Sequence, residues 1–171
     1  MINPALVLLA VLDVAASPAP YAGQEARAIK ALSAEDVASY LAGEGMGLAR
    51  AAELNHFPGP RHVLDLQAEL GLTVVQRAAV QGAYAEMDAE ARRLGAAIVE
   101  AERTLDDRFA RGDVDAAELD RAVGAIAVLQ GRLRASHLRA HLLTRAALTR
   151  EQIARYDALR GYGAGAHHGH H

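Results

Sequence analysis

The chain contains no cysteine and no tryptophan, and only 4% of its 171 residues are aromatic. The absence of cysteine excludes disulfide bonds, thiolate metal sites and cysteine nucleophiles, and it is compatible with any cellular compartment. β-branched residues are few and isolated, which argues against a core built on a β-sheet. The formal net charge is −3, which argues against general binding to nucleic acid.

Alanine, leucine, arginine and glutamate are abundant instead. These residues favour helices because their side chains lose little rotamer freedom there. Hydrophobic residues make up 51% of the sequence, and its length suits one domain. The composition therefore predicts a single all-α domain.

The two ends of the chain differ from the middle. Residues 5–12 form an apolar run followed by small residues, which is typical of a secretory signal peptide. We expect residues 1–22 to be such a peptide and residues 23–162 to form the helical domain; the alternative is an apolar N-terminal helix. The run is too short to predict a membrane span. Residues 163–171 predict a flexible, histidine-rich tail able to chelate a divalent metal, the alternative being a cloning remnant.

Prolines and glycines divide the first third of the helical domain. Ser33 with Asp36 fits a capping pattern for a helix over residues 34–55, which we expect to be broken at residues 43–47. The stretch HFPGPRH ends this helix, since two prolines and a glycine cannot continue it. A further short helix is predicted over residues 61–70, ended by the glycine that follows.

A five-residue frame, Leu-Thr-x-x-Gln, occurs twice in the sequence. The residues of its two copies are Leu72, Thr73, Gln76, Leu148, Thr149 and Gln152. In each copy the threonine is expected to be a helix N-cap, and the glutamine three residues later can reach back to the backbone N–H of that threonine. The leucine before the cap can pack back on the helix. Each copy therefore predicts the start of a helix.

Two long segments, residues 74–111 and 116–147, carry apolar residues at steps of three and four, as one face of a helix does. The first stripe comprises Val80, Tyr84, Met87, Ala91, Leu94, Ile98, Ala101, Leu105 and Phe109. The second comprises Leu119, Val123, Ile126, Leu129, Leu133, Ala140 and either Leu143 or Thr144. Gly112 and Asp113 predict a tight turn, so we expect a long antiparallel hairpin whose open end brings the two Leu-Thr-x-x-Gln motifs together. One hairpin has too little interior to be stable alone, so the N-terminal helices or a second chain must cover it.

This arrangement resembles the Spy/CpxP family of periplasmic LTxxQ-motif proteins and the related periplasmic heavy-metal sensor and resistance proteins of the CnrX/ZraP type. The resemblance covers about residues 33–162 and rests on two motifs at hairpin spacing, the second followed by IARYDALRGY. It implies an all-helical cradle in which shorter N- and C-terminal helices pack on the hairpin. It also implies a homodimer.

Members of this family are made under envelope stress, and they hold unfolding proteins without ATP, restrain a membrane-bound stress sensor, or bind metal. Chaperone members have a basic concave surface, whereas this chain is slightly acidic, which argues against client binding by charge attraction but not against binding by exposed apolar patches. The resemblance therefore implies a periplasmic, ATP-independent chaperone for unfolded or envelope proteins. The alternative is a periplasmic heavy-metal sensor or resistance protein. No nucleophile elbow, Walker loop or dinucleotide fingerprint is present, so an enzyme is not predicted.

A candidate metal site lies in the segment SHLRAHL. His137 and His141 are four residues apart, which places both imidazoles on one face of a helix and suits Zn, Ni, Co or Cu. Hairpin pairing places residues near 85–90 opposite them, and His62 is a further candidate from the N-terminal segment. The candidate ligands opposite are Glu86, Met87 and Glu90. The alternative is that the two histidines lie at the polar margin of the stripe and contact solvent or acidic neighbours.

Overall fold

The computed structural model describes residues 19–162, and over this range the protein is all-helical, which confirms the predicted class. Its helices are α1 (Ala34–Ala42), α2 (Arg50–Glu53), α3 (Pro60–Asp65), α4 (Val74–Arg111), α5 (Ala116–Ala147) and α6 (Arg150–Arg160). No strand forms within the described range, where the one β-bridge joins Ile29 and Leu32. The predicted histidine tail and most of the predicted signal peptide lie outside the described residues, so both stay predictions.

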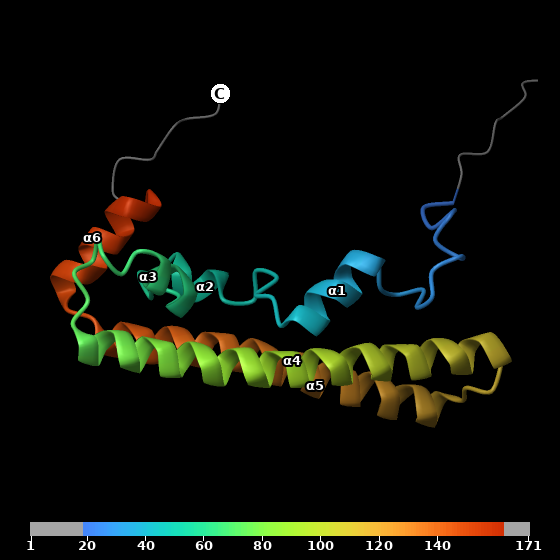
Figure 1. Ribbon diagram of the computed structural model, residues 1–171. Helices are drawn as coiled ribbons and strands as arrows, with labels where there is room; N and C mark the ends of the chain where they lie inside the picture. The colour runs from blue at the N-terminus through green and yellow to red at the C-terminus, as the bar shows by residue number, and fades with distance from the viewer. Residues whose placement is uncertain (1–18, 163–171) are drawn as a thin grey trace, which may run out of the picture.

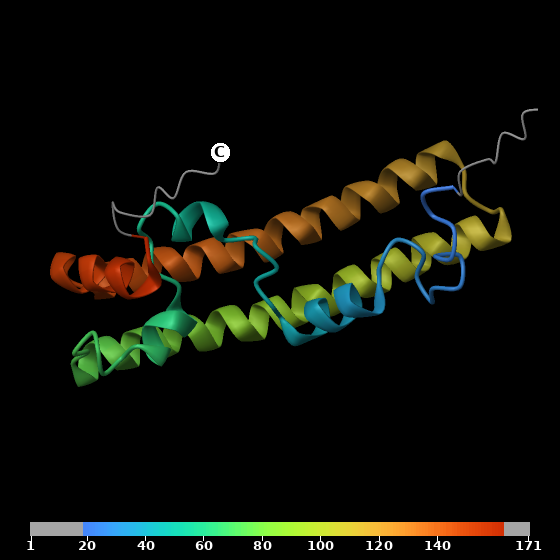
Figure 2. The same ribbon diagram turned by 90° about the horizontal axis from the view of Figure 1, so that it is seen from above.

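Helices α4 and α5 are the two long elements of the molecule, with 38 and 32 residues. They begin and end at the predicted residues, and they run side by side in opposite directions from the connection at residues 112–115 (Figures 1 and 2). Gly112 ends α4 with a φ of 69°, a left-handed conformation that glycine adopts without a Cβ clash. The side chain of Asp115 then caps α5 by accepting a hydrogen bond from the Glu118 backbone N–H.

Residues 19–72 run along one face of the α4/α5 pair (Figures 1 and 2). Helix α1 packs on α4, α2 packs on α5, and α3 packs on both. Within the described range no segment covers the opposite side of the pair, which we call the uncovered face (Figure 1). None of the helices in residues 19–162 has both the length and the hydrophobicity that a membrane-spanning helix requires.

The N-terminal helices are shorter than the sequence predicted. The capping box of Ser33 and Asp36 is present, and α1 ends before Gly43, inside the predicted break. The predicted helix over residues 61–70 is wrong in extent, because α3 ends at Asp65 and turns follow. These turns bring Leu70 into an apolar cluster with α4 and α6, and burying that side chain outweighs one further turn of helix.

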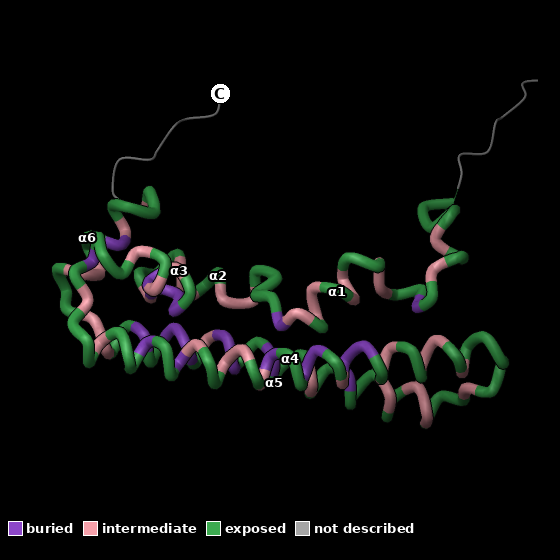
Figure 3. Tube along the Cα trace, in the orientation of Figure 1, coloured by how far each residue is buried: buried purple, intermediate pink, exposed green. Residues whose placement is uncertain are grey.

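Two separate apolar clusters hold the layers together. The first lies at the α6 end of the molecule and comprises Val63, Leu70, Val80 and Tyr156. The second lies midway along the long helices and comprises Ala91, Leu94, Ile98 and Leu133. Burial decreases toward the connection at residues 112–115, so the predicted stripes are buried only in part (Figure 3). Phe109 and Val123, which the stripes place inside, are 55% and 49% exposed.

Candidate functional site

Both Leu-Thr-x-x-Gln motifs form complete capping boxes, as predicted. The Thr73 hydroxyl accepts from the Gln76 backbone N–H at 3.2 Å, and the Gln76 side chain accepts from the Thr73 backbone N–H at 3.0 Å. Thr149 and Gln152 repeat this arrangement at 3.2 and 2.9 Å. The two motifs therefore start α4 and α6 by the same local chemistry.

The two motif glutamines also bind each other, a contact that the sequence did not predict. The Gln76 amide nitrogen lies 2.8 Å from the Gln152 side-chain oxygen, and the Gln152 amide nitrogen lies 3.1 Å from the Gln76 side-chain oxygen. Each amide also donates to a backbone carbonyl beside the other motif, Gln76 to Ala147 at 3.0 Å and Gln152 to Leu70 at 3.2 Å. The glutamines thus link the start of α4 to the start of α6.

The motif leucines pack beside this amide pair. Leu72 and Leu148 are half-buried against the cluster around Tyr156. Each precedes its threonine cap, which is the position where an apolar residue fixes the entry angle of a helix. The motif residues therefore form one junction, defined here as the LTxxQ junction, comprising Leu72, Thr73, Gln76, Leu148, Thr149 and Gln152.

Removing either amide of the LTxxQ junction should destabilise both helix starts. Gln76→Ala and Gln152→Ala are each expected to lower the free energy of unfolding by about 1–2 kcal/mol, and the double variant by about 1 kcal/mol less than their sum. Urea unfolding of the four proteins measures this coupling. Ser33→Ala removes the N-cap of α1, and Ser33 shares no hydrogen-bond partner with either glutamine, so combined with Gln152→Ala it should be additive within about 0.5 kcal/mol. If the losses in free energy of unfolding from the two glutamine variants were additive, the side chains of Gln76 and Gln152 would not stabilise each other.

The candidate metal histidines are buried rather than at a polar margin. His137 is 4% exposed and His141 is 8% exposed. Nδ1 of His141 lies 2.7 Å from the Phe57 carbonyl oxygen, to which it donates, so Nε2 carries the free lone pair. Nε2 of His137 is buried and has no hydrogen-bond partner within residues 19–162. Burial first, and the neighbouring His141 second, lower the pKa of His137 and keep its imidazole neutral.

An open pocket of about 720 Å³ brings His62, His137 and His141 to one site, between the N-terminal segment and the long helices. Its lining also includes Met46, Tyr84, Met87, Asp88 and Arg92. Burial first, and Arg160 second, lower the pKa of His62, which favours a neutral imidazole there as well.

The acidic residues that were predicted as metal ligands do not line this pocket. Glu86 and Glu90 line a separate depression of about 30 Å³ whose walls belong to α4 and α5 alone, and only Met87 borders both hollows. No three histidine, aspartate or glutamate side chains gather closely enough to hold a metal ion anywhere in residues 19–162. A metal at the histidine pocket would therefore need a thioether ligand or a movement of His62.

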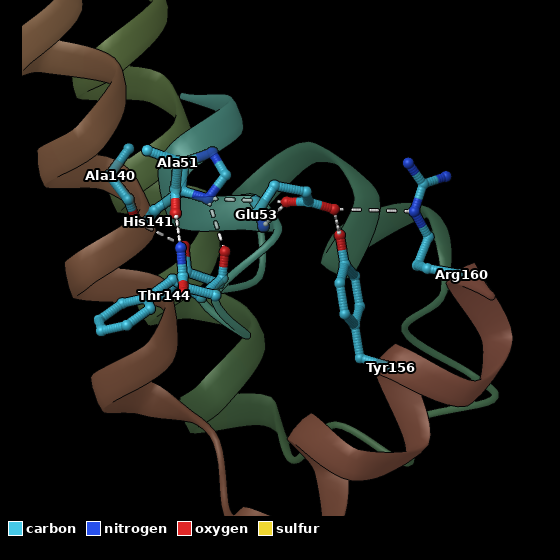
Figure 4. Close-up of polar contacts among 10 residues, drawn as sticks. Ala51, Glu53, Ala140, His141, Thr144, Tyr156 and Arg160 are labelled. Carbon is cyan, nitrogen blue, oxygen red and sulfur yellow. Dashed lines mark hydrogen bonds and ion pairs between the residues drawn. The ribbon is translucent and has the colours of Figure 1, made fainter. Parts of the chain in front are cut away.

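Glu53 is a second, partly buried polar centre close to His141, and no pattern in the sequence marked it. Its carboxylate, whose side chain is 14% exposed, accepts from the Tyr156 hydroxyl at 2.5 Å and from the Gly59 backbone N–H at 3.1 Å (Figure 4). His141 Nδ1 and Arg160 Nε lie 3.7 and 3.8 Å from it. Burial first, and Glu53 second, raise the pKa of Tyr156, so its hydroxyl stays protonated and donates.

No family model, curated protein or solved structure was found to match this chain. The LTxxQ junction, the histidine pocket and the surface of the α4/α5 pair are therefore the features of the molecule that bear on its function.

Proposed function

We propose that the protein is a periplasmic, ATP-independent chaperone of the Spy/CpxP type, which holds unfolding polypeptides on exposed apolar surface of the α4/α5 pair. The observation that carries this proposal is the reciprocal pairing of Gln76 with Gln152. Because of this pairing, the two copies of the Leu-Thr-x-x-Gln motif contact each other in the folded chain. This contact supports the resemblance to the Spy/CpxP family, and the proposal rests on that resemblance. The same proposal includes export of the protein to the periplasm and its assembly into a homodimer.

The surface of the long helices supports client binding. The uncovered face has no segment of residues 19–162 packed on it, and large apolar side chains remain accessible along the pair. Leu142 and Leu143 are adjacent on α5 and are 56% and 48% exposed. Leu143 also lines the depression between α4 and α5, where Ala83 and Met87 lie beside the charged side chains of Glu86, Glu90 and Arg139. Contiguous exposed apolar surface is typical of sites that bind other proteins.

The purified protein is expected to slow the aggregation of an unfolding client at near-stoichiometric ratio and without nucleotide. Replacing Leu142 and Leu143 together by serine should weaken this protection several-fold, because apolar contact area is lost. Light scattering of a thermally unfolding client protein measures the effect. Raising the salt concentration should leave the activity intact, since apolar contacts are not screened by ions.

Leu54→Ser is the matched control for this experiment. Leu54 is also 56% exposed, but it follows α2 in the segment that covers the opposite face. It should keep the protection of the unmodified chain. The client-binding proposal is rejected if the unmodified chain protects no client at any salt concentration, or if Leu54→Ser and the double serine variant lose activity equally.

A divalent-metal sensor or metal-resistance role is the second candidate, and the histidine pocket supports it. His137 presents a buried, unpartnered nitrogen and a lowered pKa, and imidazole must be neutral to bind a metal. His141 lies one helical turn away, with its Nδ1 held by Phe57. Met87 and His62 line the same pocket and could complete the ligand set.

Calorimetric titration with Zn, Ni, Co and Cu tests the metal site, using a chain that ends at Tyr162 so that the terminal histidines are absent. The His137→Ala/His141→Ala variant should lose binding, and Met87→Leu should weaken it. Binding should also decrease below about pH 6 as the imidazoles become protonated. Glu86→Gln should bind normally, because Glu86 lines the other depression. Equal affinity in the unmodified and double-alanine chains would rule this site out.

A further inference from the structure

Helix α6 is attached to the rest of the protein by few side chains. Of its eleven residues only Tyr156 is buried, with 1% of its surface exposed. No other helix in residues 19–162 packs closely along α6, which turns off the line of α5 toward the side that carries α3 (Figure 1). An isolated helix of this length is only marginally stable in water. The helical conformation of α6 therefore depends on the few contacts that it makes.

Tyr156 fills an apolar socket whose walls come from other parts of the chain. We define the socket as Val63 from α3, Leu70 from the turns that follow, and Val80 from α4, all of them at most 5% exposed. Leu72 is half-buried beside them. None of these residues belongs to α6, so the tyrosine is a guest in a site that the remainder of the chain provides.

Polar contacts beside the socket complete the attachment of α6. Glu53 accepts a hydrogen bond from the Tyr156 hydroxyl, and Arg160 Nε lies 3.8 Å from the same carboxylate (Figure 4). His56 Nδ1 lies 2.8 Å from Asp157 Oδ2. Helix α6 thus presents a tyrosine, an acidic residue directly after it and a basic residue four positions after it. The tyrosine and the basic residue share one side of the helix, because residues four apart are neighbours there.

Two features of these contacts oppose the docking of α6. His56 has a φ of 63°, a left-handed conformation that is uncommon for a residue with a Cβ. Asp157 Oδ1 is buried and has no hydrogen-bond partner within residues 19–162, which costs free energy in the docked state. Both costs are recovered when α6 is released. The LTxxQ junction holds the first turn of α6, so release frees the residues that follow Gln152.

We propose that the socket is a binding site for a helical peptide segment that carries a tyrosine, and that α6 is the internal occupant that keeps it closed. Release of residues 153–160 exposes the socket and the Glu53 carboxylate together. A segment that replaces α6 needs the groups that α6 supplies. These are a tyrosine for the socket and for Glu53, and a basic residue four positions later for the same carboxylate. Docking of one face of an amphipathic helix in an apolar groove is a common mode of peptide recognition.

The socket is separate from the apolar surface of the client-binding proposal. Leu142 and Leu143 lie on α5, whereas no wall of the socket belongs to that helix. Because α6 is tethered to the socket, it competes with an external segment at an effective concentration on the order of millimolar. The socket therefore opens only to a segment that binds better than α6 does. Its occupation requires neither chaperone activity nor a bound metal.

Titration of the full chain with a peptide of residues 153–162 tests this proposal. Tyr156→Ala removes the internal occupant and keeps every wall of the socket, so this variant should bind the peptide and show shifted NMR signals for the methyl groups of the socket. The unmodified chain should bind the peptide about tenfold more weakly or less, because α6 competes from within the same molecule. Arg155→Ala is the matched control, since Arg155 is exposed on α6, and it should bind as weakly as the unmodified chain.

Changes in the peptide and hydrogen exchange complete the test. Tyr156→Ala in the peptide should abolish the shifts, and Tyr156→Phe should weaken binding several-fold, because Glu53 loses its donor. In the unmodified chain, the amides of residues 153–160 should exchange about a hundredfold faster than those at the centre of α4, through local opening of α6; this measurement needs no variant. The proposal is overturned if these amides exchange as slowly as the centre of α4, if the folded Tyr156→Ala chain binds no peptide, or if it binds no better than the unmodified chain.

Discussion

Gly95→Ala is expected to release α1 from α4 and to destabilise the protein by about 2 kcal/mol. A Cβ at position 95 would lie 1.9 Å from the Tyr40 carbonyl oxygen and 2.7 Å from its carbonyl carbon. Both atoms belong to the backbone of α1, so no side-chain rotation relieves the clash. Alanine is the better helix former by about 1 kcal/mol, but that gain is smaller than the cost of displacing a packed helix.

Gly82→Ala is the matched control, since Gly82 also lies in α4 and a Cβ there meets nothing within 4 Å. It is expected to stabilise the protein by about 0.5–1 kcal/mol. Urea unfolding measures both changes, and hydrogen exchange should show faster exchange across Ala34–Ala42 in Gly95→Ala alone. If both alanine variants were more stable and the backbone amides of α1 exchanged equally slowly in both, the inferred close approach of α1 to Gly95 would be wrong.

Most of the secondary structure could be predicted because it depends on local chemistry. The two capping boxes specify where α4 and α6 begin, and Gly112 specifies where α4 ends. The end of α3 could not be predicted in the same way, because it depends on Leu70 reaching a cluster formed by distant parts of the chain. Local signals thus define an element boundary only where no tertiary contact competes with them.

The candidate metal site was predicted less well. The antiparallel pairing of α4 and α5 predicts which residues lie at the same height along the two helices, but not which side of the pair their side chains face. Glu86 and Glu90 lie level with the histidines, yet they border a different depression, and only Met87 borders both. The Gln76–Gln152 pair and the Glu53 contacts were missed for a related reason. The Gln76–Gln152 and Glu53–Tyr156 contacts each join segments more than 70 residues apart, and nothing in AELNHF distinguishes Glu53 from an exposed helical glutamate.

Glu53→Ala is expected to lower the free energy of unfolding by about 3 kcal/mol, a large effect for a side chain in a four-residue helix. Its carboxylate joins three parts of the chain, because it accepts hydrogen bonds from Tyr156 in α6 and Gly59 before α3 and lies close to His141 in α5. Tyr156 is only 1% exposed, so without Glu53 its hydroxyl has no ready access to water. An unsatisfied buried donor costs more than the net value of the hydrogen bond that was lost.

Two further variants separate the lost hydrogen bond from the lost charge. Glu53→Gln keeps an acceptor oxygen for Tyr156 and should cost about 1 kcal/mol. Tyr156→Phe removes the donor, so Glu53→Ala combined with Tyr156→Phe should cost about 1–2 kcal/mol less than the sum of the single changes. The four free energies of unfolding, measured with urea at neutral pH, give this coupling directly. A coupling of zero would mean that Glu53 acts through Gly59, His141 and Arg160, and Tyr156 would then be held in place by its apolar neighbours.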